Sequence, residues 1–267
     1  MEQARSYVCK KCYTPVPAGH KFCGRCGESV PREILTASTM LISKALEPGK
    51  AKLLVIKGEG FSSDVGDETA FLLGGRQHLA GRSQGQILFD RDNWVSPKHA
   101  NFYYRDDGKL MVKDEGSLNG VFVRVRAPVE LSGGEVFLAG EQLFRVDPTP
   151  RATDHNDADG THFYSSPKRA TPFRVTQLLR GGVQAMLISA RENAVSVGRD
   201  SCDMNFPNDP YMSGRHCKVE IGANGRFTLT DMGSKNGTYV RVQGERELAH
   251  GDYLFVGREL LRVDISA

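Results

Sequence analysis

The chain repeats itself once, at a fixed offset of 117 positions. Residues 81–147 align with residues 198–264 without a gap, and 23 of the 67 aligned positions are identical. Two unrelated segments of this length would share only a handful of residues by chance. The chain therefore contains two copies of one folding unit, and the second copy must be able to adopt the fold of the first.

Hairpins at equivalent places predict that both copies are built from β-strands. In the second copy apolar residues alternate with polar ones over 217–221 and again over 227–229, and the turn-forming pair Asn224-Gly225 lies between them. The first copy has the same pattern around Asp107-Gly108. A total of 29 glycines and 12 prolines also favours short strands and many turns. The predicted fold class is mainly β, with two β-sandwiches.

Four of the six cysteines fall close together near the N-terminus. Cys9 and Cys12 form one C-x2-C pair, and Cys23 and Cys26 form a second pair further on. Two such pairs can place four thiolates around one Zn²⁺ ion. Two disulfides or four free thiols are the alternative, which the lack of a secretory signal disfavours. We predict a zinc ribbon with one structural zinc, in which four sulfur ligands leave no open position for catalysis.

Shifts in composition suggest how the chain is divided. The segment between the two copies is rich in Pro, Thr, Asp and His and poor in apolar residues, which is typical of a flexible linker. The expected organisation is a zinc ribbon at 1–31, a linker at 32–50, a first sandwich at 51–148, a flexible linker at 149–171 and a second sandwich at 172–267.

The shared polar residues form a recognisable pattern. Each copy carries Gly-Arg, then Ser-x-x-His, and later Gly-Ser-x-Asn-Gly ahead of an apolar strand. In the second copy these are Gly198-Arg199, the segment from Ser213 to His216, and the segment from Gly233 to Gly237. This combination resembles the forkhead-associated (FHA) domain, a β-sandwich that binds phosphothreonine peptides through loops at one end. The resemblance covers both copies.

The resemblance implies a phosphate-binding role for these polar residues. A phosphothreonine carries close to two negative charges and three acceptor oxygens, so its site needs positive charge and donors. Arg199 offers a planar fork for two oxygens, and Ser213 can donate its hydroxyl to a third. By resemblance, Lys235 adds charge beside the phosphate and Asn236 holds the peptide backbone. The expected phosphopeptide-binding residues are Arg199, Ser213, Gly214, Arg215, Lys235 and Asn236 in the second copy and Arg82, Ser96, Lys98 and Asn119 in the first.

Two further repeated residues are expected to be structural. By resemblance, His99 and His216 support the loops by hydrogen bonding and do not touch the phosphate. For Arg199, a surface salt bridge is the alternative to phosphate binding.

The first copy departs from the pattern at two positions. Pro97 stands where the second copy has Gly214, and proline lacks a backbone N–H. Leu118 stands where the second copy has Lys235, so a positive charge is lost. We therefore predict that the second copy is the main phosphate reader. The first copy is expected to bind phosphate more weakly or to serve as a structural or protein-docking module.

Nothing in the chain indicates catalysis. The Ser-x-x-His segment is accompanied by no oriented acid and no nucleophile elbow, and there is neither a P-loop nor a kinase motif set. The expected function is a non-catalytic adaptor that binds phosphothreonine peptides in serine/threonine-kinase signalling, with a kinase or its substrate as the partner. The alternative is a transcription-linked regulator that senses phosphorylation and contacts nucleic acid through its zinc ribbon.

Charge and hydropathy limit the other partners. The net charge of +3 is small for a dedicated nucleic-acid binder, so nucleic acid is not an expected partner. No apolar run is long enough for a membrane span, and no apolar signal core follows Met1, so we expect a cytoplasmic protein. Thr39 has the apolar Ile42 three residues on, a position that FHA domains commonly read. Phosphorylated Thr39 could therefore dock on a sandwich of its own chain or of a neighbour.

Overall fold

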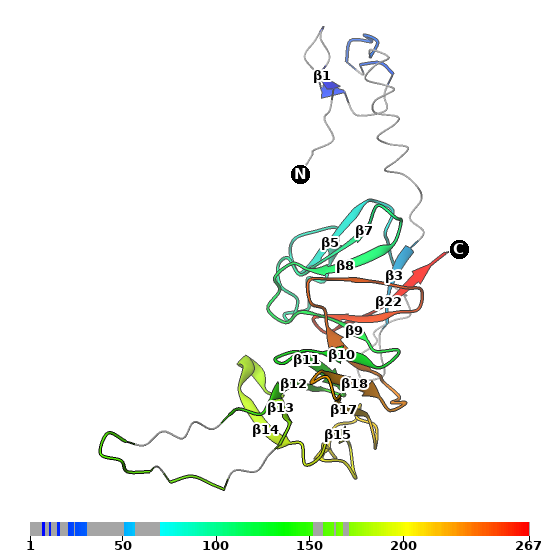
Figure 1. The fold of residues 1–267 in the computed structure, drawn as a ribbon. Helices are drawn as coiled ribbons and strands as arrows, with labels where there is room; N and C mark the ends of the chain where they lie inside the picture. The colour runs from blue at the N-terminus through cyan, green and yellow to red at the C-terminus, as the bar shows by residue number, and fades with distance from the viewer. Residues whose placement is uncertain are drawn as a thin grey trace.

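The computed structural model describes residues 7–8, 11, 15–16, 21–23, 25–30, 51–56, 70–151, 157–162, 164–167 and 171–266. Within these residues the protein is mainly β (Figure 1), and one short 3-10 helix, η1 (Arg180–Gly182), is present. The mainly β class with β-sandwiches, predicted from the alternating apolar residues, is confirmed.

The first copy supplies ten strands. They are β3 (Ala51–Val55), β4 (Ala70–Leu72), β5 (Gln77–Gly81), β6 (Ile87–Leu88), β7 (Ala100–Tyr104), β8 (Leu110–Asp114), β9 (Val121–Arg124), β10 (Val129–Leu131), β11 (Val136–Ala139) and β12 (Gln142–Pro148). The hairpin predicted around Asp107-Gly108 is formed by β7 and β8, with Phe102 opposite Val112 in register.

The second copy supplies the equivalent ten strands. They are β13 (Phe173–Leu178), β14 (Gln184–Ser189), β15 (Ala194–Gly198), β16 (Met204–Asn205), β17 (Cys217–Ile221), β18 (Phe227–Asp231), β19 (Thr238–Arg241), β20 (Glu245–Glu247), β21 (Tyr253–Val256) and β22 (Glu259–Ile265). The hairpin predicted around Asn224-Gly225 is formed by β17 and β18, with Val219 opposite Leu229.

These strands form two five-stranded sheets and one ten-stranded sheet. The five-stranded sheets have the orders β20-β8-β7-β5-β6 and β10-β18-β17-β15-β16. The ten-stranded sheet has the order β14-β13-β12-β11-β19-β9-β21-β22-β3-β4. At its centre β9 and β19 run antiparallel, and Val123 lies opposite Val240, its equivalent in the other copy. The two halves of the molecule are thus related by a pseudo-twofold axis through this residue pair.

The two copies exchange their C-terminal strands. Strands β20, β21 and β22 of the second copy pair with β8, β9 and β3 of the first. In return, β10, β11 and β12 of the first copy pair with β18, β19 and β13 of the second. We call the sandwich around β5–β8 sandwich 1 and the one around β15–β18 sandwich 2. Each sandwich therefore combines strands from both sequence copies and does not coincide with one contiguous segment.

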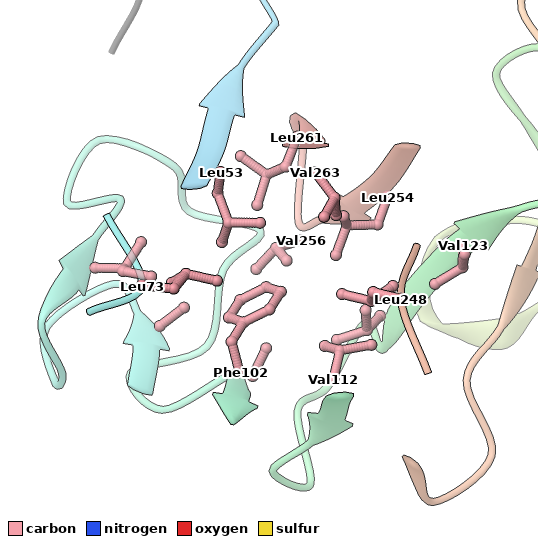
Figure 2. Close-up of a cluster of buried hydrophobic side chains, with 14 of the residues drawn as sticks. Leu53, Leu73, Phe102, Val112, Val123, Leu248, Leu254, Val256, Leu261 and Val263 are labelled. Carbon is pink, nitrogen blue, oxygen red and sulfur yellow. The ribbon is translucent and has the colours of Figure 1, made fainter. Parts of the chain in front are cut away.

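The buried cores follow the same exchange. Figure 2 shows the core of sandwich 1, where Phe102 and Leu53 of the first copy pack with Leu254, Leu261 and Val263 of the second. The core of sandwich 2 mirrors it with Phe137, Phe144 and Val146 of the first copy packed among second-copy residues. Neither core is complete without side chains of the other copy. Burying each such side chain stabilises the fold by about 1.5–3 kcal/mol.

The chain changes core within two residues at each crossing. Val123 belongs to the core of sandwich 1 and Val125 to that of sandwich 2. The return crossing takes the chain from Val240 in sandwich 2 to Val242 in sandwich 1. Because the copies are similar, a C-terminal strand finds an equivalent partner in either sandwich, and the alternation of apolar residues is satisfied by both pairings.

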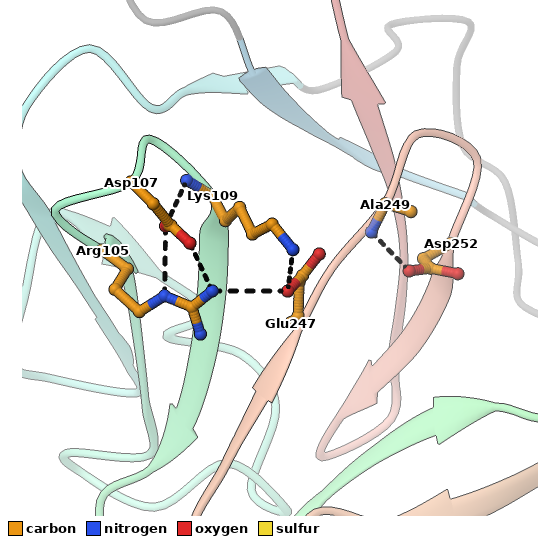
Figure 3. Close-up of polar contacts among 6 residues, drawn as sticks. All are labelled: Arg105, Asp107, Lys109, Glu247, Ala249 and Asp252. Atoms are coloured by element: carbon orange, nitrogen blue, oxygen red, sulfur yellow. Dashed lines mark hydrogen bonds and ion pairs between the residues drawn. The ribbon is translucent and has the colours of Figure 1, made fainter.

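Polar pairs accompany the exchange at the surface. Glu247 on β20 accepts from Lys109 at 2.9 Å and lies 3.7 Å from Arg105, both of the first copy (Figure 3). Arg126 of the first copy pairs with Asp252 of the second at 2.7 Å. In sandwich 2, Arg226 pairs with Glu130 of the first copy. These pairs are exposed or partly exposed and contribute little individually, but they place opposite charges across the exchanged strands.

The N-terminal region is described in part. Strands β1 (Tyr7–Val8) and β2 (Pro15–Val16) pair antiparallel, and Phe22 bridges Ser29. Gly27 has a φ of +71°, and its N–H donates to the Cys23 carbonyl at 2.9 Å, which closes a tight turn between Cys23 and Cys26. Cys9, Cys12 and residues 32–50 lie outside the described residues.

Candidate functional site

The Gly-Arg and Ser-x-x-His segments are held side by side by backbone hydrogen bonds. Arg82 N donates to the Ser96 carbonyl at 2.9 Å, and Arg199 N donates to the Ser213 carbonyl at 2.8 Å. The preceding glycines permit this approach, because a Cβ atom on Gly81 would overlap the Pro97 carbonyl oxygen. Gly198 is in the same position against the Gly214 carbonyl. The repeated Gly-Arg pair therefore brings an arginine next to a serine.

Each serine hydroxyl is oriented by the second loop. Ser96 Oγ accepts from Leu118 N at 3.0 Å, and Ser213 Oγ accepts from Lys235 N at 3.0 Å. Since the oxygen is used as an acceptor, the hydroxyl proton of each serine stays available as a donor. Both serines are partly exposed, so this donor is accessible to a ligand.

The asparagines tie the two loops together. Asn119 Nδ2 donates to the Trp94 carbonyl at 2.7 Å, and Asn236 Nδ2 donates to the Tyr211 carbonyl at 2.9 Å. No protein partner for either side-chain amide oxygen is found among the described residues. Each asparagine can therefore accept a hydrogen bond from a bound peptide while it holds the loops in place.

The two histidines lie behind the loops and are fully buried. His99 Nδ1 accepts from Ser96 N at 3.0 Å, and His216 Nδ1 accepts from Ser213 N at 3.0 Å. On the other side of each ring, Nε2 lies 3.0 Å from the carbonyl oxygen of Gly120 or Gly237. This pairing requires the neutral tautomer with the proton on Nε2. Burial lowers the pKa of both histidines, which keeps them neutral.

A carboxylate fixes the Gly-Ser-x-Asn-Gly turn in each copy. Asp231 accepts from Ser234 Oγ at 2.6 Å and from Thr238 Oγ1 at 2.7 Å, and Asp114 accepts from Ser117 Oγ at 2.9 Å. Burial opposes the charge of Asp231, but the hydrogen bonds from Ser234 and Thr238 outweigh it and hold its pKa below the usual value. The asparagine thus belongs to a turn whose geometry is fixed by hydrogen bonds to this aspartate.

The two sites differ in available charge. Arg199 is exposed, and its guanidinium has no protein partner among the described residues. In contrast, Arg82 is partly buried and its Nε donates to the Val95 carbonyl at 3.2 Å. Lys235 is exposed beside Ser213, whereas Leu118 at the equivalent place is 85% exposed and apolar.

The remaining predicted residues surround the serines. Lys98 pairs with Glu115 at 2.6 Å, which engages its charge, and its counterpart Arg215 is exposed. Pro97 is exposed at the position of Gly214. The structure therefore places the predicted residues of each copy around one loop cluster, which we call site 1 for Arg82, Ser96 and Asn119 and site 2 for Arg199, Ser213 and Asn236.

Each site is braced by an arginine of the other copy, which the sequence analysis did not single out. Gly120 and Gly237 have φ values of +82° and +84°, and a Cβ atom on Gly120 would overlap the Arg241 side chain. Gly237 is covered in the same way by Arg124. The repeated Val-Arg-Val segments carry these arginines. Only the strand exchange shows that each arginine lies on the loop of the opposite copy.

A turn of the other copy also supports each site. Arg258 N, in the turn between β21 and β22, donates to Asp92 Oδ2 at 2.6 Å, and Asp92 Oδ1 accepts from Trp94 N at 2.8 Å. At site 2, Glu141 N donates to Asp209 Oδ2 at 2.8 Å. Sites 1 and 2 are therefore composite, with loops from one copy and supports from the other.

The cysteines show no metal cluster within the part of the chain that the structure describes. Cys23 is 3% exposed and Cys26 is partly exposed, on the tight turn noted above. Cys217 is fully buried on β17, and burial raises the pKa of its thiol. Cys202 is partly buried beside the Gly214 carbonyl, 3.5 Å away. Cys217 thus packs in the core, as its alternation with Val219 predicts.

Two segments of the chain match the family model of the FHA domain, at residues 75–140 and 195–257. Both segments are therefore similar to the FHA domain, and together they make up just under half of the chain. Each matched segment contains the Gly-Arg pair and the Asn-Gly pair, and it supplies strands to both sandwiches. The comparison with curated proteins gave no match.

Several solved structures are similar to parts of the chain. Mycobacterium tuberculosis EmbR, in complex with a low affinity phosphopeptide, is 19% identical with a TM-score of 0.22. The match covers 43% of this chain but only 27% of that one. A structure from a study of phosphothreonine-dependent FHA domain interactions is 26% identical, covers 33% of this chain and 90% of that one, and has a TM-score of 0.20. The N-terminal FHA domain of Saccharomyces cerevisiae Rad53p, with a phosphothreonine peptide, is 25% identical with a TM-score of 0.16. That match covers 27% of this chain and 68% of the Rad53p chain. No helix among the described residues is long and apolar enough to cross a membrane.

Proposed function

We propose that this protein is a non-catalytic adaptor that binds phosphothreonine-containing segments of other proteins through its FHA domains. The observation that carries the proposal is the convergence of an arginine, a serine hydroxyl and an asparagine amide at one loop cluster in each sandwich. Arg199 and Ser213 supply charge and directed donors, which a phosphate requires, and Asn236 supplies an acceptor for a peptide backbone.

The unused hydrogen-bonding capacity of site 2 supports this role. Ser213 accepts from the backbone and retains its proton, and the Arg199 guanidinium lacks a protein partner among the described residues. A dianionic phosphate with three acceptor oxygens can use both groups at once. Nothing in this arrangement requires a general base or an open metal position.

The adaptor role extends to signalling by serine/threonine kinases. A phosphothreonine ligand is made by such a kinase, so the partner is a kinase or one of its substrates. The solved structures described above with bound phosphopeptides support a partner of this chemistry.

We assign the main binding activity to site 2. Lys235 adds a positive charge where site 1 has Leu118, and Gly214 keeps a backbone N–H where site 1 has Pro97. The Val95 carbonyl also engages Arg82 at site 1. Hydrogen bonds to a charged group contribute about 1.5–3 kcal/mol each, so one or two fewer contacts weaken site 1 by about ten- to a hundredfold.

The N-terminal cysteines are proposed to hold one structural zinc ion. Cys23 and Cys26 lie on a turn closed by the Gly27 N–H, and Cys23 is buried, so two thiolates from this turn can face one ion. Cys9 and Cys12, outside the described residues, would complete the set. Metal analysis of protein prepared under reducing conditions should find one zinc per chain, and Cys23→Ser should lose it while both sandwiches stay folded. Protein without zinc would contradict this assignment.

Self-association through a phosphorylated linker is a further part of the proposal. Thr36 and Thr39 lie outside the described residues, between the cysteines and β3. A phosphate at Thr39 is expected to compete with an added phosphopeptide or to produce dimers, because tethering raises its effective concentration. Unchanged competition curves and unchanged sizing would contradict it.

Phosphate-dependent binding by the full chain tests the function directly. A peptide with phosphothreonine should bind at least tenfold more tightly than the same peptide with threonine, measured by calorimetry. The double variant Arg82→Ala and Arg199→Ala should remove this difference while its thermal unfolding stays close to that of the unaltered protein. Equal binding of the two peptides by the unaltered protein would contradict the proposed function.

A further inference from the structure

A cationic cluster lies on an exposed tryptophan beside site 1. The Arg258 guanidinium carbon is 4.7 Å from the centroid of the Trp94 ring, and that of Arg180 is 6.0 Å from it. Trp94 is 37% exposed, and both arginines are exposed. Such distances are within the range of cation–π attraction, which holds a guanidinium in place and lowers the entropy lost when it binds an anion.

This cluster is attached directly to the loops of site 1. The Trp94 carbonyl accepts from Asn119 Nδ2, and the Trp94 N–H donates to Asp92. The other carboxylate oxygen of Asp92 accepts from Arg258 N. One residue, Asp92, therefore fixes both the tryptophan and the arginine relative to the asparagine that is proposed to hold a bound peptide.

Both arginines come from the second copy. Arg258 is in the turn between β21 and β22, and Arg180 is in η1, between β13 and β14. Site 1 therefore receives this positive charge from the copy that does not supply its phosphate-binding loops.

The equivalent place at site 2 has the opposite charge. The offset of 117 relates Trp94 to Tyr211 and Arg258 to Glu141. Glu141 is docked as Arg258 is, because its N–H donates to Asp209, the counterpart of Asp92. The Tyr211 carbonyl likewise accepts from Asn236. The two turns thus present opposite charges at matched positions.

Within the part of the chain that the structure describes, these charges are not neutralised by ion pairs. No carboxylate partner of Arg180 or Arg258, and no cationic partner of the Glu141 side chain, is found among the described residues. A charged group that projects beside a peptide site in this way is available to a ligand, and it repels ligands of its own sign.

We propose that the exchanged turns give the two sites opposite preferences for the residues that flank a phosphothreonine. Arg258, on Trp94 and assisted by Arg180, favours acidic flanking side chains at site 1. Glu141 favours basic flanking side chains at site 2. This inference rests on the proposed function, since it concerns the peptide selectivity of the same sites. It makes the chain a reader of two different phosphothreonine sequences.

The test isolates each site in the full chain. Arg199→Ala leaves site 1 active, and Arg82→Ala leaves site 2 active. Two phosphothreonine peptides, identical except for flanking aspartates or flanking lysines, are titrated into each variant, with their unphosphorylated forms as controls. The acidic peptide should bind about three- to tenfold more tightly than the basic one at site 1, and the order should reverse at site 2.

Charge reversal then shows which residues are responsible. Arg258→Glu should invert the preference of site 1, and Glu141→Arg should invert that of site 2. Arg151→Glu, at an exposed position after β12, changes the net charge as Arg258→Glu does and should leave both preferences unchanged.

Each outcome decides the inference. Phosphate-dependent binding with flank preferences that ignore Glu141→Arg and Arg258→Glu would overturn it and leave the proposed function intact. An equal shift caused by Arg151→Glu would show a general charge effect and would also overturn it. Loss of any difference between phosphorylated and unphosphorylated peptides would instead contradict the proposed function. If site 1 binds too weakly to compare the two peptides, the inference stands if Glu141→Arg inverts the flank preference of site 2. It is overturned if that preference is unchanged.

Discussion

Sites 1 and 2 share a scaffold and differ in the groups presented to solvent. In both, a buried histidine, a carboxylate below the turn and an arginine of the other copy hold the loops by equivalent contacts. At the surface, site 2 has Lys235 and an Arg199 with no protein partner among the described residues. Site 1 has Leu118 and an Arg82 whose Nε donates to the Val95 carbonyl. The shared contacts are structural, and we expect the differing surface residues to determine which ligand each site binds.

The comparison also shows how a duplicated domain can become one unit. Because β10–β12 and β20–β22 have changed places, neither site keeps its supports when the other sandwich is lost. Each loop that is proposed to bind phosphate is free to change its ligand contacts while the other copy continues to support it. The two sites can therefore come to differ in their ligand contacts while their supporting contacts stay the same.

The largest expected effect concerns the exchange itself. Lys113 on β8 and Glu245 on β20 are exposed and directly opposite, so cysteines at these two positions should form a disulfide under oxidising conditions. If the first copy instead closed on its own β10, Lys113 would face Pro128. Cysteines at Lys113 and Pro128 are the matched control and should remain unlinked, as peptide mapping by mass spectrometry can show. Cross-linking of the control pair alone would exclude the exchanged arrangement.

Removing a buried histidine should cost about 1–3 kcal/mol of unfolding free energy. His216→Ala leaves the Ser213 N–H and the Gly237 carbonyl without partners, and His99→Ala does the same in sandwich 1. Equal losses in chemical denaturation are expected, because this support is common to both sites. Unequal losses of unfolding free energy would show that the two histidines do not support their sandwiches equally.

The same histidines give stability a defined dependence on pH. Burial places the folded-state pKa of His99 and His216 below the ordinary value of 6.5, so the unfolded chain takes up protons first as the pH falls. Their contribution is complete above about pH 6.5 and is lost as the pH falls toward the folded pKa. The melting temperature should therefore decrease below pH 6.5, and His216→Ala should flatten this decrease. An unchanged slope in that variant would contradict the neutral, buried assignment.

Exchanging the surface residues should narrow the difference between the sites. Leu118→Lys restores the charge of site 2 to site 1 and should tighten phosphopeptide binding there by about three- to tenfold in an Arg199→Ala background. Lys235→Leu should weaken site 2 by a similar factor in an Arg82→Ala background. If neither exchange changes affinity, the difference between the sites has another origin.

The smallest expected effect is that of an arginine in one copy on the site formed by the loops of the other copy. Arg241→Ala should weaken binding at site 1 about two- to fivefold, and Arg124→Ala should weaken site 2, because each arginine covers a loop glycine of the opposite copy. Nuclear magnetic resonance of the Asn119 and Asn236 side-chain amides would locate the change. Weaker binding only at the site whose loops belong to the mutated copy would contradict the conclusion that the sites are composite.

The local fold was predictable because it depends on local signals. Alternation around Asn224-Gly225 predicted the β17–β18 hairpin, and its repetition predicted the β7–β8 hairpin. The structure also brings Arg199, Ser213 and Asn236 to one loop cluster, as the resemblance to the FHA domain implied. Each hairpin joins two strands across one short turn, and the loops of site 2 all belong to the second copy.

The exchange was not predictable by the same reasoning. The apolar residues of β20–β22 fit either sandwich, since the copies share their pattern of burial, and nothing in the sequence states which partner is used. The contacts of Arg124 and Arg241, and the placement of Arg258 on Trp94, depend on that choice. Pairings that depend on which of two similar partners is chosen require the structure.

One titration tests the central claim most directly. A phosphothreonine peptide with uncharged flanking residues is titrated by calorimetry into the full chain with Arg82→Ala and into the full chain with Arg199→Ala. Because Arg199 is exposed beside Lys235 and has no protein partner among the described residues, Arg199→Ala should remove most of the binding, and Arg82→Ala should change it little. Equal losses in the two variants, or a larger loss from Arg82→Ala, would show that site 2 is not the main phosphate-binding site.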